Sequence, residues 1–338
     1  MKHYDVYALG NALVDLEFAV SDTFLQKYDL SKGMMSLMDL QQRARLLSAL
    51  EAGCDCIKRT PGGSAANSAY TLAGFGGRAF YSCRIANDDT GHYFRTSLNQ
   101  AGIGFNDNCI VNQGHTGTCL VLVTPDAERT MQTYLGVTSD VGPDDLDAQA
   151  LTHSKWLYLE GYLAPSPSAR AAAHQARTLA KAAHVPTALS CSDPSMARFF
   201  RTELLDLIGE GVDMLFCNAE EACLLADCED LRQAATQLGA LTRELIITLG
   251  AEGALIVTND QIYNIAPFLV KPIDTNGAGD AFAGSYLYGR THEMSPEASG
   301  QLAARTSAEI VCQFGARLAF ERYHELLREH HTNQQFKD

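Results

Sequence analysis

Residues 274–280 read DTNGAGD and are followed by AFAG at 281–284, and this stretch decides how the fold and its chemistry are interpreted. Gly277 and Gly279 allow a turn that exposes successive backbone N–H groups, and a helix beginning here would direct the positive end of its dipole to the same point. A phosphate would be bound there without a lysine. Asp280 places a carboxylate beside that point, which is unfavourable unless it accepts a proton from an attacking hydroxyl group. An ordinary helix start with an acidic first turn is the alternative.

The composition is that of a globular protein with a substantial core. The chain has 338 residues, of which 46% are hydrophobic and 20% are charged. Its formal net charge of −14 argues against a nucleic-acid partner or an anionic membrane, because no basic stripe is present to neutralise phosphates. Any phosphate site must therefore be local and built from backbone N–H groups.

The cysteines and the N-terminus indicate the compartment. The ten cysteines are scattered, and the pairs Cys54/Cys56 and Cys223/Cys228 lack the spacing of zinc ligands. The first residues do not resemble a signal peptide, and no apolar run approaches the length that spans a membrane. We therefore expect a cytoplasmic protein without a membrane partner.

Short apolar strands alternate with helix-like segments along most of the chain. Strands are predicted at 4–10, 79–83, 156–159, 214–217 and 245–248, and helices at 166–183 and 219–226. This alternation predicts an α/β fold with a doubly wound, mostly parallel sheet flanked by helices.

One region departs from this alternation. Residues 118–124 and 129–135 predict a β-hairpin around the turn 125–128, and 13–20 and 34–40 predict two strands without a convincing crossover helix between them. We expect a single domain, 1–338, with a small β-sheet lid from about 13–41 and 107–136 over the carboxyl ends of the parallel strands. Arg129 on the hairpin is either an exposed strand charge or a cation that closes over a transferring phosphate.

Polar residues follow the first strand and precede a predicted helix. Gly62 and Gly63 form either a plain connector or a hinge that approaches a ligand, with Asn67 on the next helical turn as a donor to a hydroxyl group. Asn11 and Asp15 follow the first strand. Asp15 lies in an apolar stretch, where a carboxylate is costly unless it is hydrogen-bonded, and a ligand diol supplies two donors. A strand-edge Asp is the alternative.

Two further groups follow later strands. Asn218 and Glu221 can hold water around a Mg²⁺ ion, or they form a capping box at a helix start. Thr248, Gly250 and Gly253 form either an ordinary turn or a nucleotide cleft with a glycine floor. The chain has no P-loop, no dinucleotide fingerprint after a strand, no H-E-x-x-H and no G-x-S-x-G.

Three motifs in the expected order resemble the PfkB (ribokinase-like) family of carbohydrate kinases. They are GGSAAN at 62–67, N-x-x-E at 218–221 and DTNGAGDAF at 274–282, and the resemblance extends over nearly the whole chain. It implies a ribokinase-like fold and ATP-dependent transfer of a phosphoryl group to a hydroxymethyl oxygen.

The resemblance also implies roles for single residues. Asp280 is implied as the base, the N–H groups of Gly277, Ala278 and Gly279 as groups that stabilise developing charge, and Arg129 as a further catalytic residue. The residues implied at the substrate are Asn11, Asp15, Gly62, Gly63, Asn67 and Tyr162. The residues implied at ATP are Asn218, Thr248, Gly250, Gly253, Thr275 and Asn276. Glu221 is implied at Mg²⁺, through water.

Within the family, the sequence is most similar to the adenosine kinase branch. The four-residue spacing from Asn11 to Asp15 is similar to that branch, and Tyr162 lies near the position of an aromatic residue that contacts the base. This predicts an adenosine-like nucleoside as substrate, with a fructokinase or ribokinase acting on a free sugar as the alternative. The resemblance leaves open a monovalent cation such as K⁺ and the choice between monomer and homodimer.

Two alternatives belong to other functional classes. A non-catalytic nucleoside or sugar sensor on the same fold would not need Asp280 together with both glycines, and a Rossmann dehydrogenase would need the missing dinucleotide fingerprint.

Overall fold

The larger of two main sheets forms the body of the protein. The computed structural model describes residues 2–126 and 128–335, and this sheet has nine strands in the order β16-β15-β14-β13-β12-β11-β1-β5-β7. The strands are β1 (Tyr4–Leu9), β5 (Ala79–Ser82), β7 (Gly104–Phe105), β11 (Ser154–Glu160), β12 (Thr187–Ser190), β13 (Val212–Asn218), β14 (Thr242–Thr248), β15 (Ala254–Thr258) and β16 (Ile262–Ile265).

The pairing of these strands confirms the predicted doubly wound architecture. Strands β7, β5, β1, β11, β12, β13 and β14 pair in parallel, and only β15 and β16 join antiparallel at one edge. The five predicted body strands correspond to β1, β5, β11, β13 and β14. The parallel strands direct their carboxyl ends to one edge of the sheet, where ligands bind in such folds.

Helices cover both faces of this sheet. They are α3 (Ser64–Gly74), α4 (Asp89–Gln100), α5 (Ala148–Thr152), α6 (Pro167–Ala182), α7 (Pro194–Phe199), α8 (Arg201–Ile208), α9 (Ala219–Ala226), α10 (Leu231–Gly239), α11 (Ala278–Thr291), α12 (Pro296–Ile310) and α13 (Phe320–Gln335). Successive strand residues point to opposite faces. Val6 and Ala8 therefore pack with α3 and α11, whereas Tyr7 and Leu9 pack with α5 and α6.

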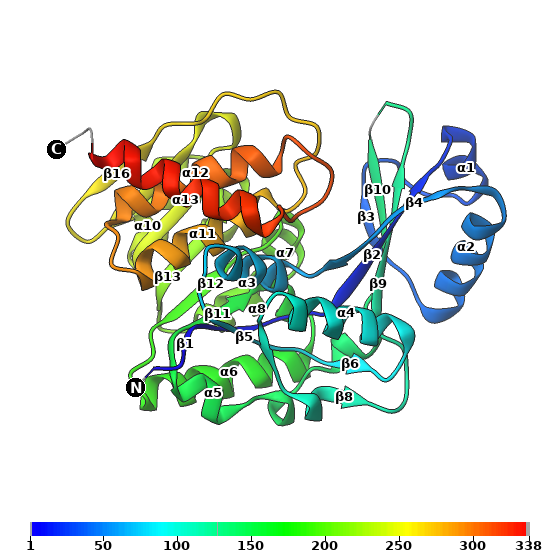
Figure 1. Ribbon diagram of the computed structural model, residues 1–338, viewed down its shortest axis with the longest axis horizontal. Coiled ribbons are helices and arrows are strands. Elements are labelled where there is room, and N and C mark those ends of the chain that lie inside the picture. Colours follow the sequence, from blue (N-terminus) through cyan, green and yellow to red (C-terminus); the bar gives the residue numbers. More distant parts are fainter. Residues whose placement is uncertain (1, 127, 336–338) are drawn as a thin grey trace.

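A smaller sheet stands beside the body, with α1 (Asp22–Lys27) and α2 (Leu40–Gly53) on its far side (Figure 1). It has five strands in the order β3-β10-β9-β2-β4. These are β2 (Leu13–Ala19), β3 (Met35–Leu37), β4 (Cys56–Gly62), β9 (Gly117–Val123) and β10 (Arg129–Tyr134). A two-stranded pair of β6 (Ile85–Ala86) and β8 (Ile110–Val111) lies under α4 in this view.

The smaller sheet differs in detail from the prediction. The hairpin forms as β9 and β10, although Ala127 in its turn lies outside the described residues. The strand predicted at 34–40 is only β3, because Asp39 caps helix α2 and ends the extended segment. The short helix α1 lies between β2 and β3, and β4 falls outside both of the ranges proposed for the lid.

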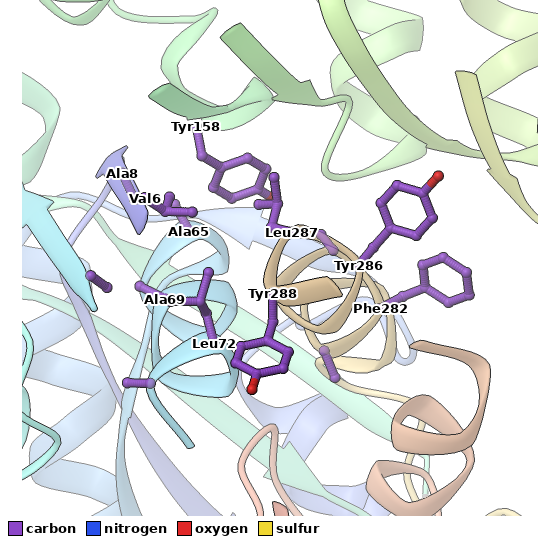
Figure 2. Packing of buried hydrophobic residues seen from close by; sticks show 14 of the residues in the cluster. Val6, Ala8, Ala65, Ala69, Leu72, Tyr158, Phe282, Tyr286, Leu287 and Tyr288 are labelled. Atoms are coloured by element: carbon purple, nitrogen blue, oxygen red, sulfur yellow. The ribbon is translucent and has the colours of Figure 1, made fainter. Parts of the chain in front are cut away.

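Helices α3 and α11 pack closely against each other (Figure 2). Ala65 and Ala69 on α3 belong to the same buried cluster as Leu287 on α11, and a Cβ at Gly284 would overlap the carbonyl oxygen of Ser68. Small residues thus allow close approach of the two backbones. This packing brings the N-terminal ends of both helices together at the carboxyl edge of the larger sheet.

The helices of residues 2–126 and 128–335 include none with the length and apolar character needed to cross a bilayer.

Candidate active site

A cavity of about 550 Å³ lies at the carboxyl ends of the body strands, against the smaller sheet. Its volume falls in the usual range for small-molecule sites. The residues proposed from the sequence that line it are Asn11, Asp15, Gly63, Asn67, Tyr162, Asn218, Glu221, Thr248, Thr275, Asn276, Gly277, Gly279 and Asp280. Segments that are far apart in the chain therefore meet at one cavity, although the role of each residue stays a prediction.

Asp280 is held by side chains from the neighbouring helix. Ser64 Oγ donates to Asp280 Oδ1 at 2.6 Å, and Asn67 Nδ2 donates to Asp280 Oδ2 at 2.9 Å. Burial raises the pKa of Asp280 to about 6, against the opposite effects of Ser64, Asn67 and the charge of Arg317. The carboxylate is therefore oriented and largely ionised at pH 7, as a base must be.

The turn before Asp280 has a shape that only glycine allows. Gly277 has φ +77°, and a Cβ there would overlap Ala316. Asp274 shapes the turn by accepting from Asn276 N at 3.0 Å and Gly315 N at 2.8 Å. The N–H group of Ala278 is turned inward and donates to Thr275 O at 3.3 Å. The expected row of three free N–H groups is thus reduced, because the turn itself uses one of them.

Asn11 and Asp15 face the cavity from the first connection into the smaller sheet. Asn11 Nδ2 donates to Tyr162 O at 3.3 Å, which orients the amide. Asp15 lies directly over Gly62, where a Cβ would stand 2.7 Å from Asp15 Oδ1. Desolvation raises the pKa of Asp15 to about 7, which is consistent with a carboxylate in a water-poor wall that lacks its own donors.

Glu160 is a buried carboxylate that sequence reasoning missed. It ends β11 and is fully buried. Its Oε1 accepts from Asn11 N and its Oε2 accepts from Ala65 N, both at 2.7 Å. Helix α3 has Gly63 as N-cap residue and no side-chain cap of its own. Glu160 supplies that acceptor from another strand and ties together the two connections to the smaller sheet.

Asn218 and Glu221 form the capping box that was one of the two alternatives. Asn218 Oδ1 accepts from Glu221 N at 2.8 Å, and Glu221 Oε2 accepts from Asn218 N at 2.9 Å. Asn218 Nδ2 also donates to Glu221 Oε1 at 2.7 Å. Burial raises the pKa of Glu221 to about 7, and the nearby Asp193 adds to this effect. The capping box does not exclude a cation, since both residues also line the cavity.

A direct metal site is absent from the described residues, because none of their His, Cys, Asp and Glu side chains form a cluster of three or more that suits a metal ion. Any Mg²⁺ held by Glu221 would therefore be bound mainly by water and by phosphate groups.

The glycine turn after β14 lies at the margin of the site. Thr248 lines the cavity, whereas Gly250 and Gly253 are not among its lining residues. Both glycines have positive φ, +58° and +94°; Gly250 begins a short 3₁₀ turn, Gly250–Glu252, and Gly253 follows it. The backbone here is open to the surface beside the cavity.

Arg129 on the hairpin lies beside the glycine turn and is paired with acidic side chains. It is not a lining residue of the cavity. Its Nη2 lies 2.9 Å from Asp274 Oδ2 and 3.6 Å from Glu17 Oε1, and its guanidinium group lies 5.8 Å from the Phe314 ring centre. These contacts are ion pairs without good hydrogen-bond geometry, since both terminal nitrogens lack a hydrogen-bond partner among the described residues. A role at a transferring phosphate would require the Asp274 pair to open.

Apolar side chains of the smaller sheet form the opposite wall of the cavity. They are Leu13, Met35, Leu37, Val121 and Met131, and Leu135 directly after β10 adds to them. Met196 and Phe200 extend this apolar surface from the body. The cavity lining thus combines polar side chains, such as those of Asp280, Asp15 and Asn11, with a largely apolar wall on the smaller sheet.

Ser64 and Arg317 are two more residues that the sequence did not single out. Ser64 follows the glycine pair, so its position at a helix start was a usable signal. Arg317 lies in the connection between α12 and α13, where neither hydrophobic periodicity nor a motif marks it.

Comparison with known proteins gives one consistent result. The model of the pfkB family carbohydrate kinases matches residues 34–322. The chain is 28% identical to the adenosine kinase of Saccharomyces cerevisiae over 327 residues, which cover 90% of this chain and 94% of that protein. It is 26% identical to the fructokinase of Vibrio alginolyticus over 238 residues, which cover 68% and 76%. Among solved structures, the adenosine kinase from Sinorhizobium meliloti matches with a TM-score of 0.88 and 33% identity, covering 97% and 99% of the two chains.

Proposed function

Because the chain belongs to the pfkB family of carbohydrate kinases, we propose that it transfers the γ-phosphoryl group of ATP to the primary hydroxyl of a ribonucleoside such as adenosine. Membership of the family makes it a phosphotransferase with a hydroxyl acceptor, and ATP and usually Mg²⁺ go with that chemistry. The choice of a nucleoside as the acceptor is what we propose.

The apolar wall on the smaller sheet is the observation that carries the choice of a nucleoside. A ribose would place two hydroxyl groups against Asp15 and Asn11 and its primary hydroxyl toward Asp280. Met35, Val121 and Met131 then face the space beyond the sugar. A purine base fills such a space with apolar surface, whereas a free sugar would leave it to water.

A free sugar remains the second candidate. The similarity to a fructokinase favours it, and the polar side chains of the cavity would suit it equally well. The apolar wall would then have no counterpart on the substrate, and a free sugar is therefore the second candidate.

In the proposed reaction, Asp280 accepts the proton of the primary hydroxyl as that oxygen bonds to the γ-phosphorus atom and the bond to ADP breaks. Ser64 and Asn67 hold both carboxylate oxygens, so little reorganisation is needed. The turn at Gly277 and Gly279 and the N-terminal end of α11 stabilise negative charge on the phosphoryl oxygens. We propose that Arg129 adds a positive charge when its pair with Asp274 opens.

The residues that would hold the cosubstrate lie along one side of the cavity. Thr275, Asn276 and Asn218 would contact ATP from the cavity wall, and Thr248, Gly250 and Gly253 from the turn after β14. Glu221 would hold Mg²⁺ through water, and a bound Mg²⁺ would neutralise charge on the phosphate groups. We propose that the smaller sheet acts as the lid, and that its apolar wall excludes water from the transfer.

A coupled kinase screen over adenosine, inosine, ribose and fructose tests the proposal, with ADP formation as the readout. We expect the highest kcat/KM with adenosine or inosine. Preferred turnover of fructose or ribose would overturn the choice of a nucleoside, and wild-type protein that phosphorylates no acceptor would support the sensor alternative.

A further inference from the structure

Arg317 lies behind the cavity wall and contacts residues of two helices, α3 and α4. Its Nε donates to Asn67 Oδ1 at 2.9 Å, and its Nη1 donates to Ser97 Oγ at 3.1 Å. Its guanidinium group stands 4.7 Å from the ring centre of Tyr70. Nη2 is buried and has no hydrogen-bond partner among the described residues. Burial of this kind is costly for a cation, so a compensating interaction is expected.

Asn67 connects Arg317 to Asp280, and only one orientation of its amide is possible. A guanidinium group can only donate hydrogen bonds, and a carboxylate can only accept them. The oxygen of Asn67 must therefore face Arg317, and its NH₂ group must face Asp280, as the distances of 2.9 Å on both sides show. Without Arg317, the amide could rotate and turn its oxygen toward the carboxylate.

The electrostatic surroundings of Asp280 give Arg317 a second effect. The titratable and charged groups that interact electrostatically with Asp280 come from five strands, helices and turns and from the connection after α12. They are Asp15 on β2, Tyr81 on β5, Tyr158 and Glu160 on β11, Tyr162 just after it, Glu221 on α9 and Arg317. The acids repel a charge on Asp280, and the tyrosines are neutral. Arg317 is the cation of this group.

We propose that Arg317 is a positioning residue for phosphoryl transfer, which fixes the amide of Asn67 as a donor to Asp280 and keeps Asp280 ionised among its acidic neighbours. The inference rests on the proposed function, in which Asp280 is the base. Arg317 does not touch the substrate in this proposal. It acts through Asn67 and through the charge of its own guanidinium group.

The test compares Arg317→Met, which removes the charge, with Arg317→Lys, which keeps it. Arg290→Met is the matched control, because Arg290 pairs with a different buried carboxylate, Glu244 at 3.1 Å, and is not among the groups that act on Asp280. The pH dependence of kcat/KM is measured with adenosine and ATP. The titration of Asp280 is followed in parallel by NMR with ¹³C-carboxyl aspartate, its signal assigned by its loss in Asp280→Asn.

We expect the midpoints of the kcat/KM profile and of the Asp280 titration near pH 6 in the wild type. Both should lie about one pH unit higher in Arg317→Met, so that activity lost at pH 6 returns at pH 8. Arg317→Lys should keep the wild-type midpoint but turn over about tenfold more slowly, since an ammonium group cannot reproduce the guanidinium fork between Asn67 and Ser97. Arg290→Met should shift neither midpoint.

An unshifted Asp280 titration in Arg317→Met, or wild-type turnover in Arg317→Lys, would overturn the proposal. If Arg317→Met does not fold, Arg317→Lys decides alone, through the combination of an unchanged midpoint and reduced turnover. If the wild type phosphorylates no acceptor, the proposed function fails, and the NMR titration still decides whether Arg317 controls Asp280.

Discussion

Replacing Asp280 by Asn removes a charge from a cavity that Asp15 and Glu160 also line, so the variant should lose activity and gain stability together. Asn has the shape of the protonated acid. Its oxygen can accept from Asn67, and its NH₂ group can donate to the hydroxyl of Ser64, which rotates to accept. We therefore expect Asp280→Asn to fold and to bind ATP, with kcat lowered by about 10²- to 10⁴-fold.

The gain in stability follows from the pKa of Asp280. Burial raises it from 3.8 to about 6 in the folded protein, so the folded state binds this proton more tightly than the unfolded state. The resulting stabilisation is fully present below pH 3.8 and is lost as the pH rises through 6. The loss is about 3 kcal/mol at most, from about two pKa units at 1.36 kcal/mol each. Asp280→Asn avoids this loss because it cannot ionise.

Urea unfolding of the wild type and Asp280→Asn between pH 4 and pH 8 measures this difference. The variant should be more stable by up to about 3 kcal/mol at pH 8, by roughly half of that at pH 5, and by little at pH 4. The exposed Asp144 provides the control, because Asp144→Asn should leave both the activity and the pH profile of stability unchanged. A stability difference that does not vary with pH, or wild-type turnover in Asp280→Asn, would refute the reasoning.

Three further substitutions test other parts of the site. Asp15→Ala should raise KM for the acceptor about 10- to 100-fold while KM for ATP stays constant, because two hydrogen bonds to a charged group are lost; an unchanged acceptor KM would remove Asp15 from the site. Glu221→Gln should raise the Mg²⁺ concentration needed for half-maximal rate about tenfold, which a Mg²⁺ titration at fixed ATP measures, and an unaltered titration would leave Glu221 as a helix cap alone. Met131→Gln should raise KM for adenosine several-fold but not for ribose, since it makes the apolar wall polar. Equal effects on both acceptors would contradict the proposed binding of the nucleobase against this wall.

The sequence predicted the body of the fold because its strands are apolar runs separated by helix-period segments. It did not indicate β4, whose residues Cys56–Gly62 include a lysine, an arginine and a proline. The reason is that β4 is an edge strand, where such residues are tolerated and no apolar face is required. The extent of the smaller sheet was therefore underestimated on that side.

The candidate site was predictable where a motif encodes backbone shape. The turn around Gly277 and the glycine pair before α3 are of this kind, and both lie at the cavity. Arg317 was not predictable, because its effect depends on contacts with Asn67 and Ser97, which are distant in the sequence. Glu160 was an intermediate case. A carboxylate directly after a buried strand is a visible signal, but its two backbone partners are not.

The parallel pairing of β2 with β9 also has a consequence for how the chain folds. Leu13 pairs with Gly117, about 100 positions later, and Asp15 thereby lies opposite Cys119 in the sheet. A pairing between such distant segments requires the closure of a long loop. The chain loses conformational entropy on this closure before the contacts of the pair can stabilise it. The wall that holds Asp15 cannot form during synthesis until the hairpin has left the ribosome. The larger sheet is completed later still, because β1 pairs with β11, which begins only at Ser154.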